Sequence, residues 1–280
     1  MDAVQGFPPA RTGGRPPVAP PLLDHVFVVL DDLAYRDVVG SRFLREEFGR
    51  VRATTDEAGT EVAGENTLIA LYPASAAPGT GLAGLVLSYE TPGSIDAARE
   101  RLDDRGASPL RCELVRRGTR PWCHVVQPEL DPDSPFHLCI AELTPEWFAA
   151  LGAVRDGGLL TRRAHLDAAH GRPAAPHHRL RDVAEVTVRL RADRARRLVA
   201  TLEALGYAVT GGPDGQRLTG PDARIRVVVD EAEPEGVLAV GLSLNRPYPH
   251  RHRFGDSSTL TGDVWTFRPR PHPASRPGHR

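Results

Sequence analysis

Two acid–base residues occupy matched positions in a segment that occurs twice in the chain. His25 is the third residue of segment 23–30, and Glu185 is the third residue of the similar segment 183–190. An imidazole titrates near neutral pH, so His25 could accept or release a proton during a reaction. Glu185 would be a general base if burial raised its pKa, but we expect a position at the surface or at the edge of a cavity.

The three cysteines, Cys112, Cys123 and Cys139, are odd in number and lack the Cys-x-x-Cys spacing of a zinc site. Cys123 directly precedes His124, which would suit a nucleophile beside its base. Adjacent residues of a strand point to opposite faces, however, so we expect reduced thiols within strands. The chain contains no lysine, which excludes Schiff-base chemistry on a lysine.

Hydrophobic periodicity predicts two copies of one βαβββ plan in the N-terminal half. The first copy has a strand at 22–30, a helix at 35–48 and strands at 50–55 and 67–72. The second has a strand at 83–89, a helix at 95–105 and strands at 110–116, 122–127 and 136–143. Internal repetition of this kind indicates a fold built from repeated supersecondary units.

The same plan returns in the C-terminal half. Strand 183–190 and helix 194–205 are followed by strands at 208–210, 217–220 and 225–229. A fourth module begins at 237–244, lacks a helical pattern, and is degenerate or truncated.

The expected division is a disordered tail at 1–20, a paired βαβββ domain at 21–150, a helical linker at 151–179, a βαβββ-like domain at 180–267 and a disordered tail at 268–280. The linker holds His165, His170, His177 and His178, which its composition suggests are solvated.

Composition describes a globular protein with a sizeable core. The chain has 280 residues, is 40% hydrophobic and carries a formal net charge of -1. Such a charge gives no field that recruits nucleic acid or anionic lipid, so we expect neither as a partner. We also find no run of about 20 apolar residues and no signal-peptide core, so we expect a cytoplasmic protein without a membrane partner.

The duplicated strand, helix and three strands, with the turn Leu205-Gly206-Tyr207 after one helix, resemble the vicinal oxygen chelate superfamily, the glyoxalase and bleomycin-resistance fold. Several motifs more closely resemble an uncharacterised bacterial glyoxalase-like family of similar length. They are Leu23-Asp24-His25 with Tyr35, residues 43–48, Gly64-Glu65-Asn66-Thr67, Pro121-Trp122, Glu142 with Pro145-Glu146, and Trp265 with Phe267. The resemblance implies an α+β fold in which paired modules curl their mixed sheets into a cup.

The resemblance also implies a metal site, because metal-binding members place a His on the first strand and a Glu at the end of a last strand. The matching residues here are His25 and Glu142, and His124 is the better candidate than His137 for a third ligand. Such a set suits a divalent ion, iron, zinc, manganese or nickel. Ala70 stands where the superfamily has a further glutamate, and the strand that opens the second module also lacks a ligand, which weakens this expectation.

Two functions remain open at this point. The first is a bacterial enzyme of specialised metabolism, of lyase, isomerase, cyclase or oxygenase type, that acts on an oxygenated substrate with His25, Glu142 and His124 as catalytic residues or metal ligands. The alternative is a metal-free protein that binds or sequesters a small molecule, as in drug resistance. In both cases the cup would be lined by four aromatic residues, Trp122, Phe27, Tyr72 and Tyr89. The C-terminal module would complete the structure or form a homodimer interface.

Overall fold

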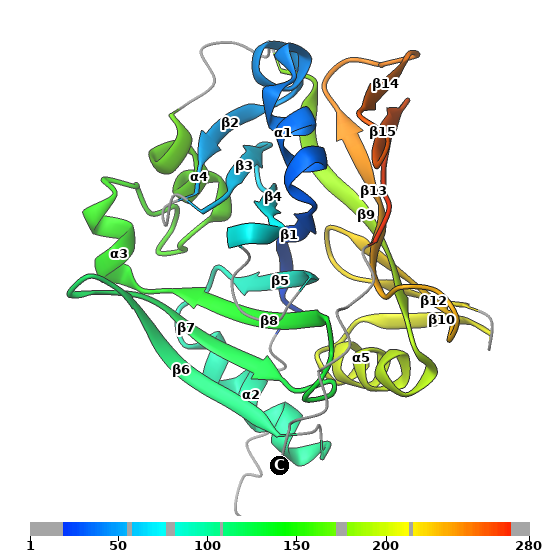
Figure 1. Cartoon of the computed structure of the whole chain (residues 1–280). Coiled ribbons are helices and arrows are strands. Elements are labelled where there is room, and N and C mark those ends of the chain that lie inside the picture. Colours follow the sequence, from blue (N-terminus) through cyan, green and yellow to red (C-terminus); the bar gives the residue numbers. More distant parts are fainter. Residues whose placement is uncertain are drawn as a thin grey trace, which may run out of the picture.

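Two eight-stranded mixed sheets form the framework of the chain (Figure 1). The computed structural model describes residues 19–54, 58–76, 82–106, 109–171, 178–212 and 215–269. The predicted disordered tails at 1–20 and 268–280 lie outside these residues, except for residues 19, 20, 268 and 269. None of the helices in the described ranges is both long enough and apolar enough to cross a membrane.

The N-terminal sheet has the strand order β2-β3-β4-β1-β5-β8-β7-β6. Its strands are β1 (Leu22–Leu30), β2 (Arg50–Ala53), β3 (Thr60–Ala63), β4 (Leu68–Pro73), β5 (Ala83–Tyr89), β6 (Leu110–Arg117), β7 (Arg120–Pro128) and β8 (Phe136–Leu143). Strand β1 is parallel to β4, β5 is parallel to β8, and the two modules join through the antiparallel pair β1 and β5. Both predicted N-terminal modules are therefore present, and β3 is a strand that periodicity did not predict.

The C-terminal sheet repeats this order as β10-β11-β12-β9-β13-β16-β15-β14. Its strands are β9 (Leu180–Leu190), β10 (Ala208–Gly212), β11 (Gly215–Thr219), β12 (Arg224–Val229), β13 (Gly236–Leu244), β14 (Arg251–Phe254), β15 (Ser258–Thr261) and β16 (Val264–Phe267). No helix separates β13 from β14 in the described chain, as predicted for the fourth module. The predicted fold class, α+β with repeated βαβββ modules in mixed sheets, is confirmed.

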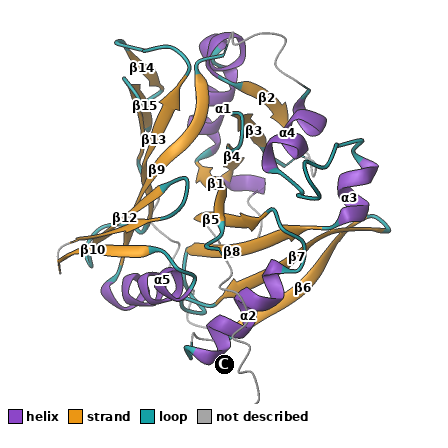
Figure 2. Ribbon diagram, turned by 180° about the vertical axis from the view of Figure 1, so that it is seen from behind, coloured by secondary structure: helices purple, strands orange, loops and turns teal. Residues whose placement is uncertain are grey.

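Helices cover the sheets unevenly (Figure 2). They are α1 (Asp32–Gly40), α2 (Ser94–Asp104), α3 (Pro145–Ala150), α4 (Arg162–His170) and α5 (Ala192–Ala204), with short helical turns at Leu44–Phe48 and Ala74–Ala76. The helix predicted at 35–48 begins earlier, because the carboxylate of Asp31 accepts a hydrogen bond from the N–H of Ala34 at 2.8 Å. It is also interrupted at Ser41, whose backbone is extended.

The two sheets share one hydrophobic core. It contains buried residues of β1, β5 and α2 from the first half and of β9, α5 and β16 from the second, and the ring of Phe48 meets Trp265 edge-on at 5.4 Å. Polar contacts also join the halves. The carboxylate of Asp222 accepts a hydrogen bond from the N–H of Leu23 at 3.1 Å, and the hydroxyl of Tyr207 donates to the carbonyl of Pro21 at 3.0 Å.

Close backbone contact between the halves occurs at Gly64. A side chain there would overlap the carbonyl of Arg181, so this position requires glycine. The neighbouring carboxylate of Asp182 accepts hydrogen bonds from the backbone N–H of Asn66 at 2.7 Å and of Thr67 at 3.1 Å. The motif Gly64-Glu65-Asn66-Thr67 therefore serves to join the two sheets.

Helix α4 covers one face of the N-terminal sheet. Leu166 packs with Leu68, Ala70 and Ala63, which alternate along β3 and β4 with the residues of the main core. The guanidinium of Arg50 donates to the Asp167 carboxylate at 3.0 Å and helps to hold the helix in place. The segment predicted as a helical linker therefore contributes a helix that covers one face of the first module.

Candidate active site

A bulge in β1 places two consecutive polar residues on the same face of the sheet. Leu23 pairs with Leu87 and His25 pairs with Val86 of β5, so Asp24 is an extra residue in β1. An extra residue breaks the alternation of side chains along a strand. As a result, Oδ1 of Asp24 lies 2.7 Å from Nδ1 of His25.

The charge of Asp24 fixes the orientation of this pair. Burial on its own would raise the pKa of the Asp24 carboxyl, but the hydrogen bond with His25 and the nearby side chains of His25, His165 and Arg162 lower it to about 2. An ionised carboxylate only accepts hydrogen bonds, so Nδ1 of His25 is the donor, and in the neutral ring Nε2 then carries the lone pair. A ring held in this way is arranged as a general base.

A second carboxylate–imidazole pair lies on the same face beneath α4. Nε2 of His170 is 3.1 Å from Oε2 of Glu61, and the His170 side chain is 1% exposed. Burial would raise the pKa of Glu61, but the adjacent His170 lowers it. Burial also lowers the pKa of His165 on the same helix, which favours its neutral form.

Glu61 stands beside the place where the superfamily resemblance expects a carboxylate. Glu61 of β3 is the register partner of Ala70 of β4, and Ala70 is the partner of Phe27 of β1. Residues paired in this way share a face of the sheet. The neighbouring strand therefore places a carboxylate beside Ala70 on this face.

Beyond β5 this face is partly open to solvent. Cys139 and Gln127 are half-buried and His137 is exposed. Burial raises the pKa of Cys123 to about 12, and it also raises the pKa of Cys139. Both thiols are free and protonated at neutral pH, so neither is an activated nucleophile.

The Glu142 carboxylate binds the start of helix α2. Its Oε1 accepts the backbone N–H of Gly93 at 2.7 Å and its Oε2 accepts that of Ile95 at 2.9 Å, and the residue is 5% exposed. Glu142 shares its strand parity with the residues of β8 that belong to the main core. The prediction that Glu142 and His25 point into one cup is therefore wrong, because the two side chains lie on opposite faces of the sheet.

His124 is exposed and is the register partner of Glu142, so it also lies away from His25. The predicted set of His25, His124 and Glu142 is not assembled. Within the described ranges, no group of three or more His, Cys, Asp or Glu side chains could hold a metal ion. These residues do not fit the implied divalent ion, since backbone N–H groups bind both oxygens of Glu142 and Asp24 binds Nδ1 of His25.

The aromatic residues predicted to line one cavity lie in separate places. Phe27 and Tyr72 pack beneath α4 on the face that carries His25. Trp122 meets Trp147 edge-on, with ring centroids 6.4 Å apart, and the guanidinium carbon of Arg117 lies 3.7 Å from the centre of its ring. Trp122 therefore packs against Trp147 and Arg117 and does not lie beside Phe27.

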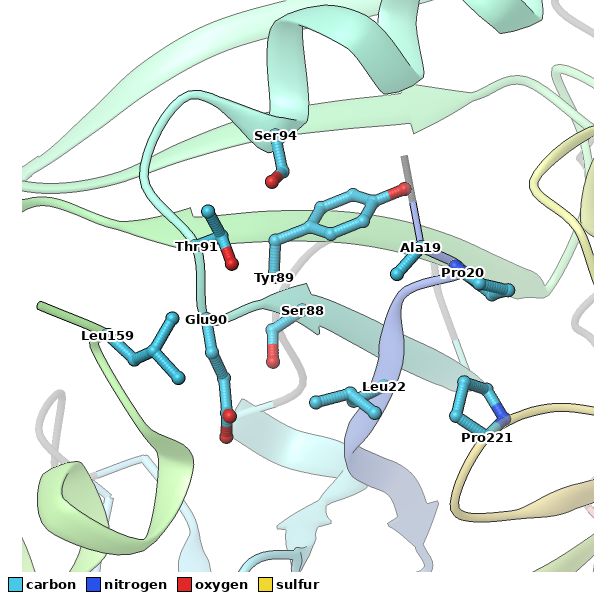
Figure 3. Close-up of a pocket in the computed structure, with 10 residues that line it drawn as sticks. All are labelled: Ala19, Pro20, Leu22, Ser88, Tyr89, Glu90, Thr91, Ser94, Leu159 and Pro221. Atoms are coloured by element: carbon cyan, nitrogen blue, oxygen red, sulfur yellow. The ribbon is translucent and has the colours of Figure 1, made fainter. Parts of the chain in front are cut away.

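Tyr89 lines a pocket of about 400 Å³ between the end of β5, the start of α2 and the loop that carries Pro221 (Figure 3). Its hydroxyl is buried and has no hydrogen-bond partner among the described residues. Burial raises the pKa of Tyr89 to about 12, so the phenol remains protonated. This pocket is distinct from the surroundings of His25.

Glu185 lies in a partly exposed ion pair on the C-terminal sheet. Its Oε2 is 3.2 Å from Nε of Arg224, and its side chain is 26% exposed. This position agrees with the surface placement expected from the sequence.

The residues that sequence reasoning missed are Asp24, Glu61, His165 and His170. The sequence contained a signal for His170, which follows Arg162 and Leu166 at intervals of four residues. These three residues form the buried side of α4.

Comparison with proteins of curated function gave no match. Among solved structures, an extradiol ring-cleaving dioxygenase from B. fuscum is 14% identical, with a TM-score of 0.47. The aligned region covers 83% of this chain and 60% of that one. A homoprotocatechuate 2,3-dioxygenase from Arthrobacter globiformis is 16% identical, with a TM-score of 0.46, and the aligned region covers 79% of this chain and 63% of that one. A Mn(II)-bound glyoxalase from Novosphingobium aromaticivorans is 13% identical, with a TM-score of 0.46 and coverage of 79% and 64%.

The chain thus spans less than two thirds of the length of these three structures. Similarity at this level assigns no activity to it. One family model covers most of the chain: it matches residues 23–267, from the first strand through the last, and the chain therefore belongs to the family described as a family of unknown function (DUF5829).

Proposed function

We propose that the N-terminal half is an enzyme that binds a small oxygenated molecule beside His25 and moves a proton on it. The observation that carries this proposal is the contact of 2.7 Å between Asp24 and His25. This contact fixes the tautomer of the neutral ring, with Nδ1 as the donor and Nε2 as the acceptor. The His25 side chain is 25% exposed, so Nε2 can meet a molecule that enters from solvent.

The surrounding residues suit proton transfer on a carbon acid, such as a hydroxyketone. His25 would remove a proton from the carbon beside the carbonyl, and the same imidazolium would return it to the neighbouring carbon. The hydroxyl proton passes to the former carbonyl oxygen, so the carbonyl and hydroxyl groups exchange places, no oxidant is needed, and the product is an isomer. Glu61 and His170 form a second proton-carrying pair on the same face, which could exchange the proton on the substrate oxygen.

The test is hydrogen exchange in D2O. Hydroxyacetone, acetoin and dihydroxyacetone are incubated with the full chain, and the loss of each C–H signal is followed by proton NMR. We expect enzyme-dependent exchange that His25→Gln reduces at least about 100-fold, the usual minimum for a positioned base. His250→Gln changes an exposed histidine between β13 and β14 and should leave the rate unchanged. Exchange that survives His25→Gln would refute the assigned role.

A second candidate function is capture of a small molecule without turnover. It is supported by the arrangement of donors, because no described set of three His, Cys, Asp or Glu side chains converges as a metal centre would require. Phe27 and Tyr72, which pack against the cluster that contains Leu166 of α4, also give this face apolar surface for a ligand. Saturable binding of the same compounds, with no exchange in D2O, would favour capture over catalysis.

A further inference from the structure

One face of the C-terminal sheet is not covered by any described helix. Buried and exposed residues alternate along β11, β12, β14, β15 and β16. Leu218 and Ile225 belong to the core beneath α5, so their neighbours Arg217 and Arg226 project from the opposite face. This opposite face is rich in arginine and threonine, whereas the corresponding face of the first N-terminal module is covered by α4.

The outer end of this face forms a regular grid of cations and hydroxyls. Arg251 of β14 is the register partner of Thr261, and Arg253 is the partner of Thr259 on β15. Thr259 is in turn the partner of Thr266 on β16. Because paired residues share a face, two guanidinium groups and three threonine hydroxyls project together.

These side chains line a pocket of about 300 Å³, which Arg268 also borders. That volume is at the lower end of the range for sites that bind small molecules. Arg251, Arg253 and Arg268 are exposed, so their guanidinium groups are open to a ligand. The pocket is therefore accessible and is lined mainly by hydrogen-bond donors.

The positive charge of this pocket is only partly balanced. Nη2 of Arg253 lies 3.1 Å from Oδ1 of Asp256, but the Asp256 side chain is 97% exposed. An ion pair in that position is screened by water and contributes little. Among the residues that the structure describes, Arg251 and Arg268 have no ion-pair partner, so two cations remain for an external anion.

We infer that this pocket is a binding site for the phosphate-type oxyanion of a small molecule. Planar guanidinium groups bind two oxygens of such an anion in parallel, and threonine hydroxyls can donate to the others. Arg251, Arg253, Thr259 and Thr261 offer both kinds of donor within one small pocket, whereas the Thr266 hydroxyl donates to the carbonyl of Thr259. The site is remote from His25 and does not depend on the function proposed for it.

The experiment uses the full chain with inorganic phosphate and, in parallel, sulfate as probes. Backbone amide shifts of the threonines in β15 and β16 are followed by NMR during each titration, at constant ionic strength maintained with chloride. We expect saturable binding that Arg251→Gln weakens roughly ten- to hundredfold, because one charge-assisted contact is lost. Thr261→Val, which keeps the charge, should weaken it by a smaller factor. Binding of both anions would show that the shared tetrahedral oxyanion is recognised.

Arg226→Gln is the matched control, since Arg226 is an exposed arginine on the same sheet face outside this pocket. It should leave phosphate affinity within about twofold, the effect of a general change in charge. Equal weakening by Arg226→Gln and Arg251→Gln would show a diffuse field rather than a site, and shifts that fail to saturate would also overturn the inference. Thermal melts of each variant establish that it is folded.

Discussion

Replacement of Glu142 should reduce stability rather than remove a reactive group. Its two oxygens accept the backbone N–H groups of Gly93 and Ile95 at 2.7 and 2.9 Å, at the start of α2. Hydrogen bonds to a charged group contribute roughly 1.5–3 kcal/mol each. Glu142→Ala leaves the buried N–H of Ile95 without an acceptor and the N–H of the exposed Gly93 to water, so we expect a loss of about 2–4 kcal/mol in the free energy of unfolding. Glu142→Gln keeps one acceptor oxygen and should cost about 1–2 kcal/mol.

Urea denaturation followed by circular dichroism measures both values, with Glu203→Ala as the control. Glu203 is exposed on α5, and its replacement should change the free energy of unfolding by less than about 0.5 kcal/mol. The D2O exchange rate of folded Glu142→Gln should equal that of the wild type. A loss below about 1 kcal/mol in Glu142→Ala, together with loss of exchange, would refute the capping role and return Glu142 to the reacting centre.

Three further predictions concern buried polar groups. Because the folded-state pKa of Asp24, about 2, lies below the ordinary value of 3.8, its stabilising contribution is complete above about pH 4 and is lost as pH falls towards 2. Acid denaturation of Asp24→Asn should therefore be less steep in this window, and an identical slope would contradict the assigned charge. Iodoacetamide at pH 7.5 should label the exposed Cys112 and leave Cys123 and Cys139 unmodified in intact-mass spectra, since burial raises the pKa of both of these thiols; early labelling of either would be evidence of an activated thiol. Arg162 is paired with Glu90 at 3.3 Å and Asp222 at 2.6 Å, so Arg162→Gln should cost about 3–5 kcal/mol in urea denaturation, whereas Arg163→Gln, at a side chain 61% exposed, should cost less than about 1 kcal/mol; similar losses would show that the buried pairing adds nothing.

The repeated fold could be predicted because it rests on local patterns. Strands such as β1 and β9 are followed by helices with an apolar stripe, and these periods are visible in the sequence. Strand β3 was missed because it has only four residues, Thr60–Ala63, beside a hairpin turn. The break at Ser41 was missed because the apolar spacing continues to Phe48 across it.

The site was harder to predict because it depends on strand parity and on distant segments. Glu142 has the same parity as Phe136, Leu138 and Ile140, the large apolar residues that face the helix, so its direction could have been read from β8 itself. The bulge at Asp24 has no local signal, since it arises from pairing with β5. The contact of His170 with Glu61 joins residues more than 100 positions apart, beyond the reach of spacing rules.

The start of the first strand makes hydrogen bonds with residues from the last third of the chain. The carbonyl of Pro21 accepts a hydrogen bond from Tyr207, and the N–H of Leu23 donates to Asp222. Arg162 of helix α4 donates to both the carbonyl of Leu23 and the carboxylate of Asp222. During synthesis, β1 leaves the ribosome first but must wait for nearly 200 further residues before these partners exist. A fragment that ends after β8 would lack helix α4 and these hydrogen-bond partners, and would expose the shared core. The halves are therefore repeats in architecture but a single unit in folding, which the order of their synthesis makes slow to complete.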